Sequence, residues 1–478
     1  MTKKNEEVVN LRYIFSLTLV ATLGGLLFGY DTAVISGTVG SLEKFFIEPY
    51  GLPETVANSM LGRVVSSALI GCVIGGLLGG IVSLKLGRRN SLKLAALLFL
   101  ISALGSSMPE MFFAPLGEGD HTFVNHFIFY RIIGGIGVGM ASMLSPMYIA
   151  EIAPANIRGR LVSWNQFGII SGILLVYFVN YSISLKGDDS WLNDIGWRWM
   201  FASEVIPASL FLIFLFFIPE TPRYLVIRNN PEKALGVLKK IYRPETAMKV
   251  LDEIKGTIIQ KSGKLFSYGA LVIVIGISMA VFQQFVGINV VLYYAPEIFR
   301  NMGATTDVAL LQTVVVGMIN MLFTIIAIFT VDKFGRKPLQ IIGALGMAFF
   351  MFALGLSFYF QMVGFGVLIF MLGYVACFAM SWGPVTWVLL SEIFPNRIRG
   401  RAMALAAATI WISNYLVSWT FPIMDKSTFL ISLFNHGFSY WIYGFMGILA
   451  ALFIWKFVPE TKGKTLEEME KIWTRKPG

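Results

Sequence analysis

The pattern of hydrophobic and polar positions divides this chain into long apolar runs separated by short polar segments. Twelve runs of about 20 residues recur from end to end, and each is long enough to cross roughly 30 Å of hydrocarbon as a helix. We therefore predict an all-α membrane protein with twelve transmembrane helices. The expected spans are residues 13–36, 60–82, 91–109, 125–150, 161–184, 199–218, 268–299, 308–331, 338–360, 366–390, 402–424 and 438–457.

The longest polar insertion, residues 219–266, separates two sets of six spans. Asn230 before Pro231 predicts a helix start, and apolar residues then recur at helical spacing. We expect short cytoplasmic helices that link an amino-terminal bundle (1–218) to a carboxy-terminal bundle and tail (267–478); a plain tether is the alternative. The recurring apolar residues are Ala234, Leu235, Leu238 and Ile241, followed by Met248, Leu251, Ile254 and Ile258.

Three polar motifs occur in the same order in both sets of spans, about 240 positions apart. Such a long-period self-match indicates a duplicated unit. Two similar half-bundles around a shared interface are the architecture of an alternating-access transporter. The motifs are GRR (Gly87–Arg89), EIAPANIRGR (Glu151–Arg160) and PETPR (Pro219–Arg223), matched by GRK (Gly335–Lys337), EIFPNRIRGR (Glu392–Arg401) and PETKG (Pro459–Gly463).

Composition agrees with a membrane protein, since 56% of residues are hydrophobic and only 14% are charged, against roughly 25% charged in soluble domains. The net charge of +10 reflects Lys and Arg in the loops on one side, which predicts cytoplasmic loops there and cytoplasmic termini. This bias accounts for the charge, so nucleic acid is not an expected partner. The first span is too long for a signal peptide and contains Asp31, so we expect permanent insertion.

The residue types typical of cofactor, metal or nucleotide sites are absent or poorly placed. Cys72 and Cys377 fall inside spans as packing residues, and no disulfide is expected. The glycine runs Gly75–Gly80 and Gly134–Gly139 suit close helix packing better than nucleotide binding, and Walker and kinase signatures are missing. We therefore expect no cofactor, no metal and no ATP-driven transport. The histidines have no metal-ligand spacing: His121, His126 and His436.

Three ionisable residues lie inside predicted spans, where a charge is costly enough to indicate function. Asp31, Arg131 and Glu204 fall at similar depths in spans one, four and six, so they could meet. An arginine neighbour favours the charged form of an aspartate, and its loss lets the aspartate take a proton. We interpret the group as a proton site; a permanent ion pair that fixes helix packing is the alternative.

Span seven has the most polar midsection of the chain. Gln283, Gln284 and Asn289 both donate and accept hydrogen bonds, which suits a hydroxyl-rich neutral solute. Gly287 between them allows local unwinding, as in the broken helices of transporter sites. Amides with flat indole faces suggest a sugar, although ordinary bonds between helices would use the same residues. Further candidates in other spans are Gln166, Asn320, Trp387, Trp411 and Asn414.

The repeated motifs also place an acid and several arginines at the cytoplasmic helix ends of both halves. Glu151 and Glu392 would pair with arginines to close the inner side and separate as it opens. The alternative is that the arginines only set the topology, which would need no acid. The arginines of this predicted gate are Arg88, Arg158, Arg336 and Arg399.

Several segments resemble the sugar porter family of the major facilitator superfamily, and within it the bacterial D-xylose:proton symporters, over nearly the whole chain. They are SLTLVATLGGLLFGYDTAVISGTV, DKFGRKP (Asp332–Pro338), QQFVGINVVLYYAPEIF, EIFPNRIRGR and PETKG. The resemblance implies that Asp31 is the proton-coupling acid, with Arg131 as its partner and Glu204 assisting. It also implies sugar contacts from Gln166, Gln283, Gln284, Asn289, Tyr293, Asn320, Gly383 and Trp387, with Trp411 lining the site.

The chain departs from the family pattern at three positions. Ile173 and Ile410 stand where the xylose symporters have glutamine, and each missing amide removes a hydrogen bond of about 0.5–1.5 kcal/mol. An apolar wall would tolerate the extra hydroxymethyl group of a hexose better. Ser83 replaces an acid of the first GRR motif, so the amino-terminal gate would be weaker. Asp31, by contrast, is an acid that the mammalian facilitators lack, which favours symport.

We therefore expect a multi-pass transporter of the bacterial inner membrane that imports a neutral monosaccharide with a proton and works as a monomer. D-xylose is the first candidate and D-glucose the second; galactose and arabinose are alternatives. A proton-independent uniporter is the main rival. A membrane enzyme would need a metal or nucleotide-sugar motif that the loops lack, and a sugar sensor would need a longer tail.

Overall fold

The computed structural model describes residues 9–154, 157–258, 265–362, 365–395, 397–462, 468–469 and 472–473. These residues form helices and contain no β-strand. Twelve of the helical segments are long and apolar enough to span a membrane, which confirms the predicted spans. Several run further than the hydrophobic pattern indicates. The second, for example, begins at Glu54 rather than near residue 60, because the helix continues through polar residues until Pro53 interrupts it.

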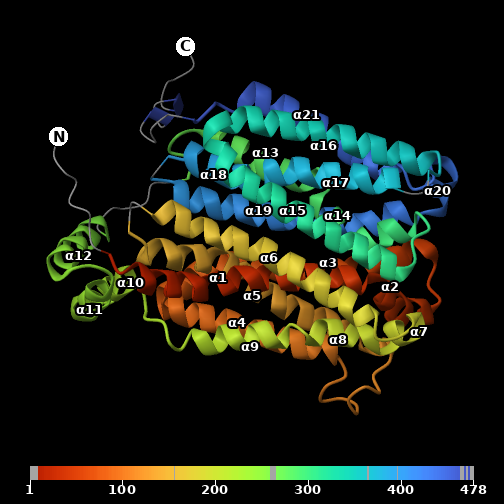
Figure 1. Cartoon of the computed structure of the whole chain (residues 1–478), viewed down its shortest axis with the longest axis horizontal. Coiled ribbons are helices and arrows are strands. Elements are labelled where there is room, and N and C mark those ends of the chain that lie inside the picture. Colours follow the sequence, from red (N-terminus) through yellow and green to blue (C-terminus); the bar gives the residue numbers. More distant parts are fainter. Residues whose placement is uncertain are drawn as a thin grey trace.

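The long helices lie side by side in two layers (Figure 1). The amino-terminal layer contains α1 (Leu11–Val34), α2 (Val39–Leu42), α3 (Glu54–Leu86), α4 (Arg88–Ser107), α5 (Val124–Ile152), α6 (Arg158–Ser184), α7 (Asp189–Trp191), α8 (Trp197–Ala202) and α9 (Val205–Phe214). The carboxy-terminal layer contains α13 (Ala270–Phe285), α14 (Ile288–Arg300), α15 (Thr306–Phe334), α16 (Arg336–Tyr359), α17 (Phe365–Met380), α18 (Trp382–Ile393), α19 (Arg399–Asp425), α20 (Thr428–Phe434) and α21 (Phe438–Phe457). We call these layers the two halves.

Three short helices lie at one end of the molecule, which we call the linker end (Figure 1). They are α10 (Pro222–Ile227), α11 (Pro231–Ile241) and α12 (Pro244–Ile258). Ala234, Leu238 and Leu251 form part of a small separate core there, as the spacing predicts. The predicted helix start is confirmed, since Asn230 is the N-cap residue of α11 and Pro231 is its first residue, although the Asn230 side chain makes no capping hydrogen bond. One detail is wrong: Met248 is 56% exposed. The opposite end, which carries α2, α7 and α20, is the far end.

Glycines let α3 and α5 approach until their backbones touch. A Cβ atom at Gly135 would lie 1.8 Å from the Ala68 carbonyl oxygen, and one at Gly139 would lie 2.3 Å from that of Cys72. Both distances are far below van der Waals contact, so any larger residue would force the helices apart. The structure thus confirms that the glycine run in α5 serves helix packing.

Three of the twelve spans are broken near their middle, and each break lies at a predicted site residue. Glu204 falls between α8 and α9, and Gly383 follows the break between α17 and α18. The third break, between α13 and α14, has Gly287 in the left-handed region with φ of 95°. Only this third break was anticipated from the sequence. Broken helices expose backbone groups in the middle of a bundle, which is where transporters bind their substrates.

Candidate functional site

The amino-terminal half contains a buried ion pair between α1 and α5. Arg131 Nη1 donates to Asp31 Oδ1 at 2.7 Å, and Nη2 donates to the Asp31 carbonyl oxygen at 2.9 Å. Both side chains are at most 1% exposed. Gly134 makes room for the carboxylate, because a Cβ atom there would lie 3.2 Å from Asp31 Oδ1. The structure therefore places these two predicted residues in direct contact.

Glu204 is the third ionisable residue of this cluster and is fully buried. It lies close enough to Asp31 and Arg131 to interact with both electrostatically. Neither of its oxygens has a hydrogen-bond partner within the described part of the chain, and the same holds for Asp31 Oδ2 and Arg131 Nε. Two carboxylates and one guanidinium leave one negative charge uncompensated, which is costly in a dry interior. A single proton would neutralise the cluster.

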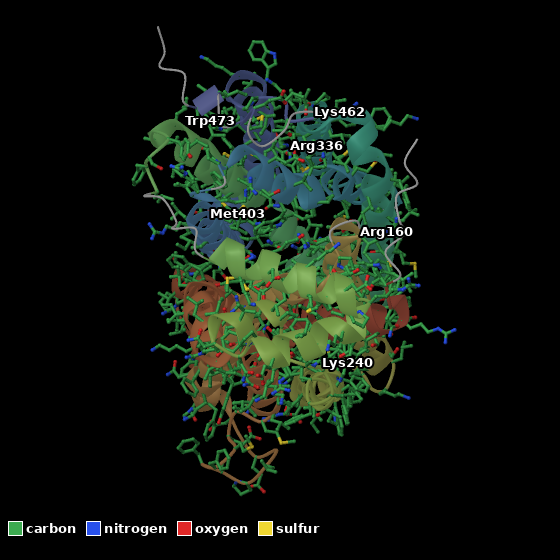
Figure 2. The ribbon with its side chains drawn as sticks, turned by 90° about the vertical axis from the view of Figure 1, so that its left-hand side faces the viewer. Arg160, Lys240, Arg336, Met403, Lys462 and Trp473 are labelled. Atoms are coloured by element: carbon green, nitrogen blue, oxygen red, sulfur yellow. The ribbon has the colours of Figure 1, made fainter. Side chains whose placement is uncertain are left out.

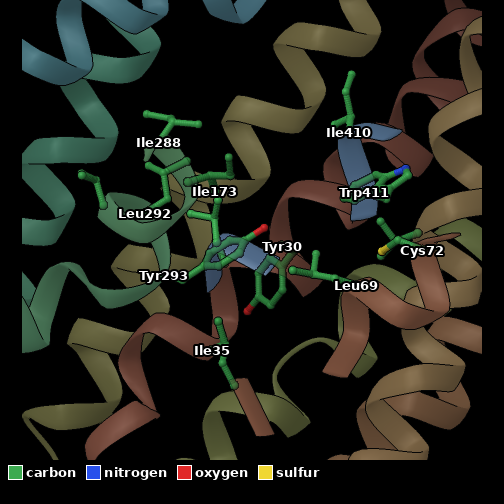
Figure 3. Packing of buried hydrophobic residues seen from close by; sticks show 14 of the residues in the cluster. Tyr30, Ile35, Leu69, Cys72, Ile173, Ile288, Leu292, Tyr293, Ile410 and Trp411 are labelled. Atoms are coloured by element: carbon green, nitrogen blue, oxygen red, sulfur yellow. The ribbon is translucent and has the colours of Figure 1, made fainter. Parts of the chain in front are cut away.

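Tyr30 and Ser203 connect the helices that carry the two acids. Their hydroxyl oxygens are 2.7 Å apart, and each residue directly precedes an acid in the sequence. In Figure 3 the ring of Tyr30 lies beside that of Tyr293 from α14. The Tyr293 hydroxyl is also close enough to interact electrostatically with Asp31 and Arg131. The acid cluster of one half therefore adjoins the predicted sugar site of the other.

The amides of span seven gather around the break at Gly287. Gln283 Nε2 donates to the Trp382 carbonyl oxygen at 3.0 Å, whereas its Oε1 is buried and has no partner among the described residues. Asn289 Nδ2 donates to Gln284 Oε1 at 2.5 Å. Each amide thus keeps hydrogen-bonding groups that a hydroxyl-rich ligand could use.

Span eleven adds a second polar group, next to Tyr293. Asn414 Nδ2 donates to the Tyr293 hydroxyl at 3.3 Å, and its Oδ1 accepts from Ser418 at 3.0 Å. Trp411 packs against Phe28 of the other half with ring centroids 5.4 Å apart. The remaining predicted contacts are placed more loosely: Asn320 is buried, Gln166 and Gly383 are half-buried, and Trp387 is 37% exposed.

The two isoleucines that depart from the family pattern lie in one apolar cluster with Tyr293 and Trp411 (Figure 3). Ile173 from α6 is 8% exposed and Ile410 from α19 is 5% exposed. They come from opposite halves, so both halves present an apolar side chain beside the polar groups. The structure thus forms an apolar wall where a glutamine pair would offer hydrogen bonds.

At the linker end, each half brings its three repeated motifs together into one cluster. Arg88 Nη2 contacts Glu151 Oε1 at 2.9 Å, and the Thr221 hydroxyl donates to Glu151 Oε2 at 2.6 Å. In the other half, Arg336 contacts Glu392 at 3.0 Å, and Thr461 donates to it at 2.5 Å. Each ion pair joins two residues of the same half, so neither pair connects the two halves. The remaining arginines of the predicted gate donate to backbone carbonyl oxygens: Arg158 to Ala153, and Arg399 to Phe394.

Two further glutamates complete these clusters, and sequence reasoning assigned them no role. Glu220 accepts from the backbone N–H of Arg88 at 2.9 Å, and Glu460 accepts from that of Arg336 at 3.1 Å. They cap helices α4 and α16, whose own N-cap residues are glycines without a side chain to do so. The repeated PET motif, with its acid at the same place in both halves, was the signal that could have revealed them.

Residues 17–473 match the family of sugar (and other) transporters. The chain belongs to this family. It is therefore a transporter rather than an enzyme, and the sugar porter resemblance seen in the sequence is confirmed. The predicted major facilitator fold is confirmed by a solved structure, since a proton:xylose symporter of the major facilitator superfamily matches 97% of this chain with a TM-score of 0.83 and 63% identity.

The relatives within the family transport several sugars. The D-xylose-proton symporter of Escherichia coli K12 is 63% identical over 97% of this chain and 96% of its own length. The glucose facilitated diffusion protein of Zymomonas mobilis is 42% identical over 96% of this chain and 97% of its own. The inward-open structure of the E. coli xylose transporter XylE has a TM-score of 0.88 and 61% identity, covering 96% of this chain and all of XylE. Such relatives place the chain in a bacterial inner membrane.

Proposed function

We propose that this transporter imports D-xylose together with a proton by alternating access, working as a monomer. One observation carries the proposal: two buried carboxylates lie near a single guanidinium, which pairs with one of them, directly beside a site lined by amides. The cluster is neutral only with a proton bound, and the amides suit a neutral polyol. A relative named as a D-xylose-proton symporter, 63% identical over nearly the whole chain, supports this assignment.

In the proposed cycle, Asp31 carries the proton. With Asp31 charged, Arg131 holds it as in the structure; when Asp31 is protonated, the ion pair weakens and the two helices can move apart. Glu204 provides an alternative partner for Arg131 at that moment. Since Tyr293 adjoins the cluster, sugar contacts on α14 and proton binding influence one another, as coupled transport requires. One proton crossing 100 mV supplies roughly 2.3 kcal/mol.

We place the linker end in the cytoplasm, with both termini on that side. Arg160, Lys240, Arg336 and Lys462 lie there (Figure 2), and basic residues favour cytoplasmic loops. In this orientation the clusters of Glu151 and Glu392 act on the inner side, where we propose that they form the gate. We further propose a division into residues 1–218, the linker 219–266 and residues 267–478.

The proposed sugar contacts are the amides and aromatic residues around the breaks in spans seven and ten. Ile173 and Ile410 make D-glucose the second candidate substrate, because they present apolar surface in place of two amides. The contacts are Gln166, Gln283, Gln284, Asn289, Tyr293, Asn320, Gly383 and Trp387, with Trp411 lining the site.

The deciding experiment measures uptake of labelled xylose and glucose in vesicles, with and without a proton gradient. The wild type should concentrate sugar only when the gradient is present. Asp31→Asn should abolish concentration against a gradient while downhill sugar exchange persists, because a neutral amide cannot carry the proton. Glu48→Gln, which removes an exposed carboxylate, is the control. Uptake that ignores the gradient would instead identify a uniporter.

A further inference from the structure

Polar contacts that join the two halves gather at the far end of the molecule. Lys426 Nζ binds Glu43 Oε2, and the backbone N–H of Thr428 donates to Glu54 Oε1 at 2.7 Å. Both glutamates belong to the amino-terminal half, whereas Lys426 and Thr428 lie at the turn from α19 to α20. Close by, the Trp419 indole N–H donates to the Ser59 carbonyl oxygen at 3.2 Å. The far end is thus held shut by bonds between halves.

The Glu43–Lys426 ion pair differs from the pairs at the linker end, because its partners come from opposite halves. Their side chains are 24% and 27% exposed, so most of each is shielded from water. Shielding strengthens an ion pair relative to one at a free surface. The pair therefore stabilises only those conformations in which the two halves meet at the far end.

A second charged group fits closely against the amino-terminal half in the same region. Arg300 and Glu297 form an ion pair at the end of α14. A Cβ atom at Gly40 would lie 2.5 Å from Arg300 Nη2, so these charges rest directly on the backbone of α2. Contact this close between Arg300 and α2 is possible only when the two halves meet at the far end.

The lysine is also tied to the broken helix of the sugar site. Its neighbour Asp425 accepts from Asn301 Nδ2 at 3.0 Å, and Asn301 directly follows α14. This bond joins the turn that carries Lys426 to the helix that carries Asn289 and Tyr293. A movement of α14 would therefore be transmitted to the ion pair.

We propose that Glu43 and Lys426 form a latch that holds the far end closed and must separate each time the transporter opens to the outside. Glu54, bound to the start of α20, reinforces it. The inference rests on the proposed alternating-access cycle and orientation. Since the partners sit on opposite halves, no outward-open state can keep them paired. The latch consequently sets how often the sugar site faces outward, without touching sugar or proton itself.

The test compares Glu43→Gln and Lys426→Met with the charge-swapped variant E43K/K426E. A protein that spends more time outward-open binds external sugar with lower KM, because the competent state is more populated. Each single variant should lower the external KM by about two- to fivefold, the effect of losing a partly exposed ion pair. The swapped variant should restore the wild-type KM. Glu48→Gln, an equal loss of charge in the same segment, should change nothing.

A distance measurement across the far end provides a second readout that does not depend on transport. Spin labels at Val56→Cys and Phe429→Cys, exposed positions on opposite halves, should show more of the long distance in each single variant and less in the swap. Cys72 and Cys377 are first replaced by alanine. Wild-type distances and KM in both single variants, or no restoration in the swap, would overturn the latch. Failure of the wild type to take up sugar would instead refute the proposed function.

Discussion

At the scale of single residues, the buried charges and the buried amides of this transporter differ in the chemistry that they offer. Asp31, Arg131 and Glu204 form a compact group that is electrically neutral only with one proton bound. The amides are neutral and keep hydrogen-bonding groups for a ligand. Ile173 and Ile410 place apolar surface beside these amides, and for this reason we expect the site to accept a hexose more readily than a site with two glutamines would.

Replacing these isoleucines should shift sugar preference. Ile173→Gln and Ile410→Gln each restore an amide, and one added hydrogen bond of about 0.5–1.5 kcal/mol corresponds to roughly 2- to 13-fold in affinity. We expect the ratio of xylose to glucose affinity to rise by this order in each single variant and further in the double variant. Competition assays with both sugars measure it. A preference unmoved in the double variant would show that these positions do not select the sugar.

A histidine at the far end should make stability depend on pH. Asp425 Oδ1 accepts a hydrogen bond from His436 Nδ1 at 3.3 Å, and this bond raises the pKa of the imidazole above its usual value of 6.5. Protonation therefore favours the folded state, so the contribution is complete below about pH 6.5 and is lost as pH rises through the folded-state pKa. It should be less than about 1 kcal/mol because the ring is partly exposed.

Thermal melting of His436→Gln checks this sign. The variant should melt at a lower temperature than the wild type at about pH 5.5. This difference in melting temperature should vanish near pH 9, where the His436 imidazole of the wild type is neutral in both the folded and the unfolded state. His121→Gln, at the same end of the molecule, is the control. A gap that widens with rising pH would contradict the assignment.

At the scale of helices, the break between α13 and α14 is supported by side chains from other parts of the carboxy-terminal half. Tyr374 donates to the Val286 carbonyl oxygen at 2.8 Å, which satisfies a backbone group that the break between α13 and α14 leaves free. At the same break, the ring of Tyr443 fills the space next to Gly287. The interruption is therefore supported from two other helices.

A side chain at this break should damage both stability and transport. Gly287→Ala imposes a left-handed alanine, costing about 1–2 kcal/mol, and puts its Cβ 2.7 Å from the Tyr443 ring. Gly303→Ala is a matched control, since Gly303 also has positive φ (88°) but open space around it. We expect only the first variant to slow sugar exchange and to lose clearly more stability in thermal melts. Equal behaviour of the two would mean that the break has no special part in transport.

The hydrophobic pattern could predict the spans, the packing glycines and the contact of Asp31 with Arg131, because these follow from lipid exposure and from the cost of buried charge. It could not predict the breaks at Glu204 and Gly383. Each break lies inside what reads as one continuous span, and the groups that support it come from distant segments: Tyr30 bonds to Ser203, and Gln283 donates to the Trp382 carbonyl oxygen. The latch partners were also missed, since Glu43 and Lys426 look like ordinary loop charges in the sequence.

At the scale of the whole molecule, the duplicated halves are similar in design but unequal in burial. In the amino-terminal cluster the Arg88 and Glu151 side chains are 6% and 11% exposed, against 13% and 25% for Arg336 and Glu392. Breaking an ion pair costs more the less water can reach the charge left behind.

The two clusters should consequently differ in their effect on stability. Glu151→Gln should cost about 2 kcal/mol or more, and Glu392→Gln about 1 kcal/mol, as expected for a more buried and a more exposed pair. Thermal melting of the two variants, each compared with the wild type, measures the difference. Equal losses, or a larger loss in the carboxy-terminal half, would contradict the role given to burial.

The glutamate caps have a consequence for how the protein is made. Helix α4 starts at Arg88, yet the carboxylate that caps it belongs to Glu220, 132 positions later. A nascent chain that has inserted its first five spans still lacks this group. The amino-terminal half can therefore complete its own structure only once the ribosome has translated past the sixth span into the linker, and the same dependence recurs between α16 and Glu460. Biosynthesis would then proceed in two steps, each ending with a PET motif.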